Sequence, residues 1–158
     1  NSKPNYNPKY DIFFSGQETS KNRNDLIEFL KSKKYNFFGR AENSKIPFKE
    51  YLSNIYDSSI NLALEGKGEF TFRHLEILAS CSFMLCERSI NELELPIPLV
   101  DEKHFVSFKD KEDLIEKIDF YLKNDDLRNK IALNGRKVLE DHYSPKKHGN
   151  ILMSKIFE

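Results

Sequence analysis

The chain has 158 residues, enough for one domain that buries about two thirds of the surface exposed by its unfolded form. Its 25 basic residues (Lys and Arg) balance 25 acidic ones, which argues against a broad nucleic-acid-binding or membrane-binding surface, so any anion site must be local. No apolar run approaches the roughly 20 residues of a membrane-spanning helix and no signal peptide opens the sequence, so we expect a cytoplasmic location.

The cysteine and histidine residues show no spacing typical of metal ligands. Cys81 and Cys86 are expected to be buried free thiols in a reducing compartment. The histidines fall in separate predicted segments: His74, His104, His142 and His148. We therefore expect no metal ion and no other cofactor.

The first part of the chain predicts a linker followed by a strand, a loop and a helix. Residues 1–9 have the proline and asparagine content of a linker, and residues 10–158 are expected to form the domain. The apolar run 10–14 predicts a buried strand, and a helical spacing of apolar residues covers 24–33. The loop between them carries groups that a phosphate would need: Ser15, Gly16, Lys21 and Arg23.

The middle of the chain repeats this alternation. Residues 35–38 predict a second strand, and residues 47–56 a helix that begins with a proline at a permitted position. The loop 40–46 lies between them. The central unit then predicts a strand, a glycine loop, a helix and a strand, over 60–64, 65–70, 71–80 and 82–86.

The remainder of the chain is mostly helical. A proline-rich connection over 90–101 leads to a short predicted strand at 104–108. Two apolar stripes at helical spacing follow, over 114–122 and 127–139, with a break at residues 124–126.

Strands that alternate with helices indicate a parallel sheet, because parallel strands need long crossover connections. We therefore expect an α/β fold: a Rossmann-like parallel sheet with helices on both faces and an α-helical C-terminal tail. Ligands of such sheets bind beyond the carboxyl ends of the strands, which brings the loops after the first, second and third strands together.

The central glycine loop and its helix carry the clearest chemistry. Gly66 and Gly68 would let the backbone approach a phosphate, and Thr71 precedes a helix N-terminus, which favours negative charge. Arg73 could bind a diphosphate through two hydrogen bonds. Glu76 could accept hydrogen bonds from the two hydroxyl groups of a ribose.

Each of these features has a plainer alternative. The glycines could form a flexible loop without a ligand, because a single Gly-x-Gly is weak evidence. Arg73 and Glu76 could form an i,i+3 ion pair on a solvated helix face. Lys21 and Arg23 could belong to an ordinary solvated loop.

The segment 68–80, G-E-F-T-F-R-H-L-E-I-L-A-S, followed by F-M-L at 83–85, resembles the nucleotide-sugar-binding core of glycosyltransferases with two Rossmann-like domains, the GT-B fold. It is most similar to the C-terminal domain of the CgeB-like, spore-maturation type, with its pattern Gly-acidic-x-Thr-Phe-Arg-x-x-Glu-x-Leu-Ala. The resemblance extends over most of the chain after residue 10, which would make this domain one half of a GT-B fold.

The resemblance implies a donor site. Glu76 would bind the ribose of a UDP- or GDP-sugar, the glycine loop and Arg73 would hold its diphosphate and sugar, and the loop 40–46 would lie near the base. The implied donor-binding residues are Gly16, Lys21, Arg23, Gly66, Gly68, Glu69, Thr71, Phe72, Arg73 and Glu76. Many retaining relatives carry a further glutamate eight positions before the ribose-binding one. Gly68 stands there, beside Glu69, so no catalytic residue is assigned.

The resemblance also implies a partner domain. In the GT-B arrangement the acceptor, and often a catalytic base, belong to an N-terminal domain that this sequence lacks. The chain would therefore supply the donor-binding half of a metal-independent glycosyl transfer, with no nucleic acid involved.

Two other functions remain open at this stage. The opening Y-D-I-F-F-S-G-Q-E-T at 10–19 is similar to the start of a TIR domain, a signalling module that can cleave NAD, although the similarity ends after the first helix. A non-catalytic module that binds a nucleotide or a partner protein would have the same fold.

Overall fold

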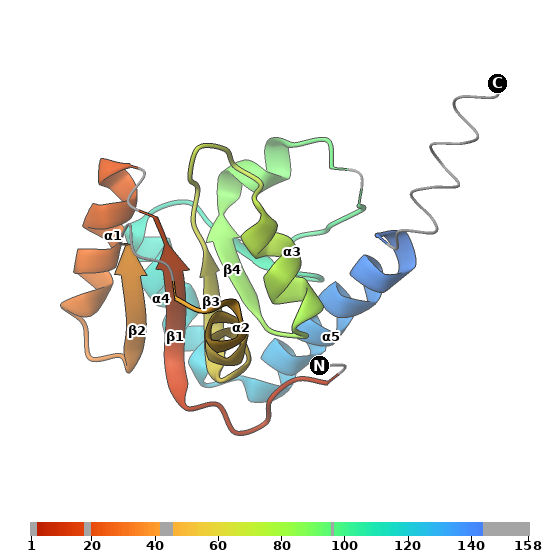
Figure 1. Cartoon of the computed structure of the whole chain (residues 1–158), viewed down its shortest axis with the longest axis horizontal. Coiled ribbons are helices and arrows are strands. Elements are labelled where there is room, and N and C mark those ends of the chain that lie inside the picture. Colours follow the sequence, from red (N-terminus) through yellow and green to blue (C-terminus); the bar gives the residue numbers. More distant parts are fainter. Residues whose placement is uncertain (1–2, 18–19, 42–45, 96, 144–158) are drawn as a thin grey trace.

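The structure is a computed structural model, and it describes residues 3–17, 20–41, 46–95 and 97–143. Its centre is a five-stranded sheet in the order β2-β1-β3-β4-β5, with every paired strand parallel (Figure 1). The strands are β1 (Tyr10–Gly16), β2 (Phe37–Ala41), β3 (Ser58–Ala63), β4 (Met84–Glu87) and β5 (Val106–Phe108). The structure thus confirms the expected parallel α/β fold.

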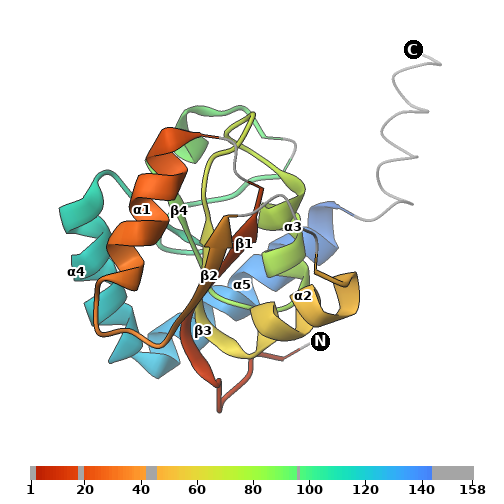
Figure 2. The ribbon, with the colours of Figure 1, turned by 60° about the vertical axis from the view of Figure 1, so that its left-hand side comes forward.

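Helices cover both faces of the sheet, as Figure 2 shows. The helices are α1 (Lys21–Lys31), α2 (Phe48–Tyr56), α3 (Phe72–Ala79), α4 (Lys111–Leu122) and α5 (Asp125–His142), with a short 3-10 helix η1 (Arg88–Glu92). One core cluster joins α1, α4 and the middle of α5 to the sheet, and the other joins α2 and α3 to its opposite face.

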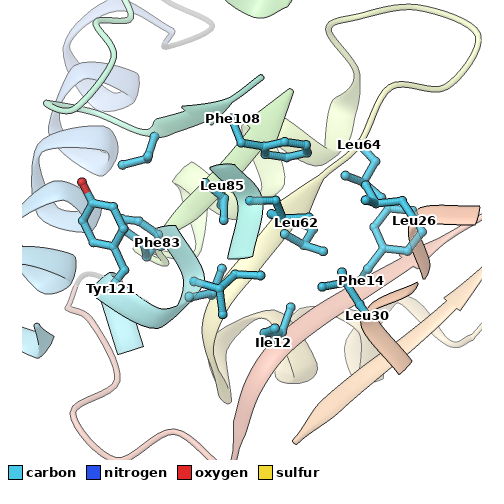
Figure 3. Close-up of a cluster of buried hydrophobic side chains, with 14 of the residues drawn as sticks. Ile12, Phe14, Leu26, Leu30, Leu62, Leu64, Phe83, Leu85, Phe108 and Tyr121 are labelled. Carbon is cyan, nitrogen blue, oxygen red and sulfur yellow. The ribbon is translucent and has the colours of Figure 1, made fainter. Parts of the chain in front are cut away.

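The side chains of β1 point alternately into the two core clusters. Ile12 and Phe14 pack into the cluster under α1 and α4, whereas Phe13 packs into the cluster under α2 and α3. This follows from the period of two residues along a strand, since successive side chains point to opposite faces. Figure 3 shows the first cluster, in which Ile12 and Phe14 face Leu26 and Leu30 of α1.

The start of α1 differs from the prediction in a way that matters for the site. The helix begins at Lys21, with Ser20 as its N-cap accepting a hydrogen bond from the backbone N–H of Arg23. Lys21 and Arg23 therefore belong to the first turn of a helix and not to the loop in which the sequence placed them. A polar first turn on a capped helix has no apolar periodicity, which is why the predicted helix began three residues late.

Other boundaries move by a few residues. Strand β2 runs to Ala41 because its backbone pairs with β1 as far as Gly16, whereas the apolar pattern ended at Phe38. Only Lys123 and Asn124 separate α4 from α5, since Asp125 and Asp126 lie in the first turn of α5. The proline-rich connection also begins with η1, which the sequence did not predict.

The N-terminal segment packs against the domain. Pro4 is buried, and the Asn5 side-chain amide donates to the backbone carbonyl of Tyr56 at 3.1 Å. Lys9 pairs with Asp57 at 2.8 Å. Within its described residues, the segment predicted as a linker is thus held at the amino-terminal edge of the sheet.

Two further expectations can be compared with the structure. Cys81 and Cys86 are free and buried, as predicted, and burial raises the pKa of both thiols. None of the described helices combines the length and the apolar character needed to cross a membrane.

Helix α5 packs closely against the segment that leads into β5. A Cβ atom placed on Gly135 would lie 2.6 Å from the backbone carbonyl oxygen of His104 and 2.6 Å from Leu78. Only glycine fits this contact, because a backbone carbonyl cannot turn aside as a side chain can.

We expect Gly135→Ala to lower the free energy of unfolding by about 1–3 kcal/mol, measured by urea denaturation. Gly68→Ala is the matched control, because no atom lies within 4 Å of a Cβ placed there. Equal stability of the two variants would show that α5 can shift away from His104 without cost.

Candidate functional site

A cavity of about 640 Å³ opens at the carboxyl ends of β1 and β3. The strand order reverses between these two strands, since β1 is followed in sequence by β2 on one side and β3 lies on the other. Open α/β sheets bind ligands at such a switch point. Helices α2 and α3 bound the cavity on one face of the sheet, and the start of α1 reaches it from the other.

The structure brings most of the predicted site residues together around this cavity. Its lining includes Gly16, Arg23, Gly66, Thr71, Phe72, Arg73 and Glu76. Lys21, Gly68 and Glu69 are exposed and do not line it. The ligand-binding role of all ten stays a prediction. In the loop 40–46, residues 42–45 lie outside the described residues, while Ile46 lines the cavity.

Arg23 is buried, with only 4% of its surface exposed. Its guanidinium donates to the carbonyl of Gln17 at 2.8 Å, to that of Leu64 at 3.0 Å, and to that of Glu65. These carbonyls follow β1 and β3, so Arg23 ties the start of α1 to the ends of both strands. The alternative of a solvated loop is therefore wrong for Arg23.

Arg73 reaches the same place from α3. It donates to the carbonyl of Ser15 at 2.8 Å and lies within 3.5 Å of the Leu64 carbonyl oxygen. Its guanidinium stands 4.7 Å from the centre of the Phe14 ring, and that of Arg23 stands 5.5 Å from the same centre. One aromatic ring and one carbonyl thus serve both arginines.

Two guanidinium groups so close together give the cavity a positive floor. Burial, and then the charge of Arg73, lower the pKa of Arg23, while the carboxylate of Glu87 opposes that shift. Arg23 and Arg73 each keep a buried Nε donor with no hydrogen-bond partner in the described part of the chain. An anion in the cavity would offset the repulsion between the two cations.

Both glycines of this floor make room for an arginine. A Cβ atom on Gly16 would lie 2.6 Å from Nη2 of Arg73, and one on Gly66 would lie 2.9 Å from Nη2 of Arg23. The backbone N–H of Gly66 donates to the carbonyl of Gly68 at 3.2 Å, which closes the loop on itself. Gly16 and Gly66 thus admit the guanidinium groups of Arg73 and Arg23, and the approach of a phosphate to this backbone stays a prediction.

Glu76 forms no ion pair with Arg73 among the described residues, so the plain i,i+3 alternative is wrong. Its Oε2 accepts a hydrogen bond of 2.9 Å from the hydroxyl of Tyr51 on α2. Burial is the main cause that raises the pKa of Tyr51; the charge of Glu76 adds to it and that of Arg73 opposes it. This contact could not be predicted from the sequence, because helical spacing shows only that Tyr51 faces inward.

The rim of the cavity is aromatic. Phe48 and Phe72 are 63% and 82% exposed, and they are the first residues of α2 and α3. Phe72 lies in the first turn of α3 and points into solvent and not into the core. Flat apolar side chains at a cavity mouth suit a flat aromatic ligand group.

His74 supports the N-terminus of α3. Its Nδ1 accepts a hydrogen bond from the backbone N–H of Thr71, the N-cap residue, at 3.1 Å, and Phe70 stacks on its ring. Burial lowers the pKa of His74 to about 4, so the ring is neutral near pH 7. The role of His74 beside the cavity is therefore structural.

No group of three or more His, Cys, Asp or Glu side chains is arranged to hold a metal ion in the part of the chain that the structure describes. The charged side chains among the described residues of the cavity are two arginines, Lys67, and the Glu76 carboxylate with its tyrosine partner. This arrangement suits an anionic ligand that also carries hydroxyl groups.

Comparison with known proteins supports this interpretation of the fold. A family model described as glycosyl transferase-like matches residues 21–153. The solved C-terminal domain of a glycosyl transferase group 1 family protein, LpcC from Francisella tularensis, matches with a TM-score of 0.60 and 20% identity, over 88% of each chain. At that identity the match shows the fold alone. No curated protein matches the chain.

The cap on α3 predicts a pH dependence of stability. The pKa of His74 falls from 6.5 when unfolded to about 4 when folded, so the unfolded chain binds the proton more strongly. The contribution of neutral His74 to the free energy of unfolding is complete above about pH 6.5 and is lost as the pH falls to 4. Between pH 7 and pH 4, we expect the free energy of unfolding of His74→Gln, which keeps an acceptor for Thr71, to fall by roughly 2–3 kcal/mol less than that of the wild type. Urea denaturation from pH 7 to pH 4 measures it, and parallel profiles for variant and wild type would contradict it.

Proposed function

The chain belongs to the glycosyl transferase-like family, and from this premise we propose that it is the C-terminal, donor-binding domain of a glycosyltransferase. The donor would be a nucleotide-diphosphosugar such as a UDP- or GDP-sugar. The cavity that joins Arg23 and Arg73 to Glu76 at the switch point is the observation that carries this proposal. The spore-maturation subtype and a cytoplasmic location are finer parts of the same proposal.

The two ends of the cavity suit the two ends of a nucleoside diphosphate. The diphosphate would lie over the positive floor, near Gly16 and Gly66, and close to the N-terminus of α3. Glu76 would accept hydrogen bonds from the ribose, and the exposed rings of Phe48 and Phe72 would lie beside the base.

The transfer reaction requires stabilisation of the leaving group. When the sugar leaves, negative charge grows on the diphosphate, and fixed positive charge stabilises it. Arg23 and Arg73 are already fixed by backbone carbonyls, so they would act without rearranging during the reaction. No metal ion is needed for this role.

One domain supplies only the donor-binding side of the cleft in which such a reaction takes place. Among the described residues, the side chains that line the cavity include no histidine and one carboxylate, Glu76, which the proposal assigns to the ribose. The acceptor and a catalytic base would come from a second, N-terminal domain. Alone, the chain would bind nucleotide and transfer little.

The two alternatives differ in what they predict. A TIR-like domain would cleave NAD and self-associate. A non-catalytic partner-binding module would tolerate Glu76→Ala without loss of function. The family match favours the glycosyltransferase.

Titration with UDP, GDP and ADP, followed by NMR, tests the proposal directly. We expect shifts to cluster over residues 66–76 and around Arg23, and to be unchanged by a metal chelator. Absence of any shift at millimolar concentrations of all three nucleotides would count heavily against donor binding.

A second test replaces Arg73 by lysine, which keeps the charge but not the planar group that binds the Ser15 carbonyl and stacks on Phe14. We expect the dissociation constant of the best nucleotide to rise about tenfold or more, by isothermal titration calorimetry. Arg136→Lys is the matched control, because Arg136 binds the Ala79 carbonyl and Glu140 outside the cavity. If both changes raised the dissociation constant equally, Arg73 would not belong to the proposed site.

A further inference from the structure

The hydroxyl of Tyr51 lies between the two charged groups of α3. It donates to Oε2 of Glu76 at 2.9 Å, and the charge of Arg73 also acts on it. Arg73 and Glu76 are three residues apart on one helix, so their long side chains are within reach of each other. They nevertheless form no ion pair among the described residues, and Arg73 instead binds the Ser15 carbonyl.

The ring of Tyr51 has little freedom. The Phe13 ring lies 5.9 Å from it at a tilt, and the Phe48 ring stacks at 6.2 Å, measured between centroids. Tyr51 lies on α2 and Glu76 on α3, so one hydrogen bond joins two helices that flank the cavity. A rigid donor of this kind fixes the carboxylate that accepts from it.

The bond leaves one carboxylate oxygen available. Within the described residues, Oε1 of Glu76 has no hydrogen-bond partner, while Oε2 is held by Tyr51. Glu76 is only partly buried and lines the cavity, so a ligand hydroxyl can reach it. A carboxylate is an acceptor only, and it therefore suits the donor hydroxyl groups of a sugar.

We propose that Tyr51 is a positioning residue that holds Glu76 away from Arg73 and toward the ribose, and so makes the site select nucleotides with a vicinal diol. The inference rests on the proposed nucleotide site and adds to it the residue that sets its selectivity. Without the phenol, Glu76 is free to turn toward Arg73, which would cancel the charge of both groups.

The test compares UDP, 2′,3′-dideoxy-UDP and inorganic pyrophosphate as ligands of the full chain, by isothermal titration calorimetry. For the wild type we expect UDP to bind about tenfold or more tightly than its dideoxy form, as is typical of a hydrogen bond to a charged group. In Tyr51→Phe this ratio should fall toward one, mainly through weaker UDP binding.

Tyr35→Phe is the matched control. The hydroxyl of Tyr35 donates to Oδ1 of Asp119 at 2.8 Å, so the change removes the same type of bond outside the cavity. We expect it to leave the ratio unchanged. Thermal unfolding of both variants verifies that each is folded.

The outcomes separate the inference from the proposed function. A ratio in Tyr51→Phe equal to that of the wild type would overturn the inference alone. An equal loss for UDP, its dideoxy form and pyrophosphate would also overturn it, because Tyr51 would then only support the fold of the site. A wild type that binds none of the three would overturn the proposed function together with the inference.

Discussion

The contact of two guanidinium groups with the Phe14 ring and the carbonyl of Leu64 holds this domain together at the edge of the sheet where the cavity lies. Arg23 arrives from α1 and Arg73 from α3, helices on opposite faces of the sheet. Their shared contacts join the ends of β1 and β3, beyond the last residues that pair between the two strands, Phe13 and Asn61. The two arginines also leave net positive charge in the cavity.

Much of the fold was predictable because burial leaves a clear pattern in the sequence. The buried strands are short apolar runs, so their parallel pairing could be expected from the alternation with helices. Their ends were less predictable. The extent of β2, for example, depends on pairing with β1 through Gly39 to Ala41, where no apolar side chain marks the strand.

The site was predictable where it follows a strand end and hidden where it depends on distant contacts. The loop and helix after a predicted strand carry Gly66, Arg73 and Glu76, so it could be expected that these residues lie at one edge of the sheet. Arg23 was predicted as a site residue, but its burial could not be predicted, because its carbonyl partner Leu64 is 41 residues away and a charged residue near a helix start suggests exposure. Tyr51 was missed for the same reason, since Glu76 lies 25 residues further along.

The aromatic rim and the arginine floor differ in how freely they can change during evolution. Gly16 and Gly66 each admit a guanidinium group, so a larger residue at either position would displace an arginine that also anchors a strand. Phe48 and Phe72 stand at the beginnings of their helices, mostly in solvent. Replacing them costs the core little. Substitutions at these two helix starts would therefore change the mouth of the cavity while leaving the two arginines beneath it in place.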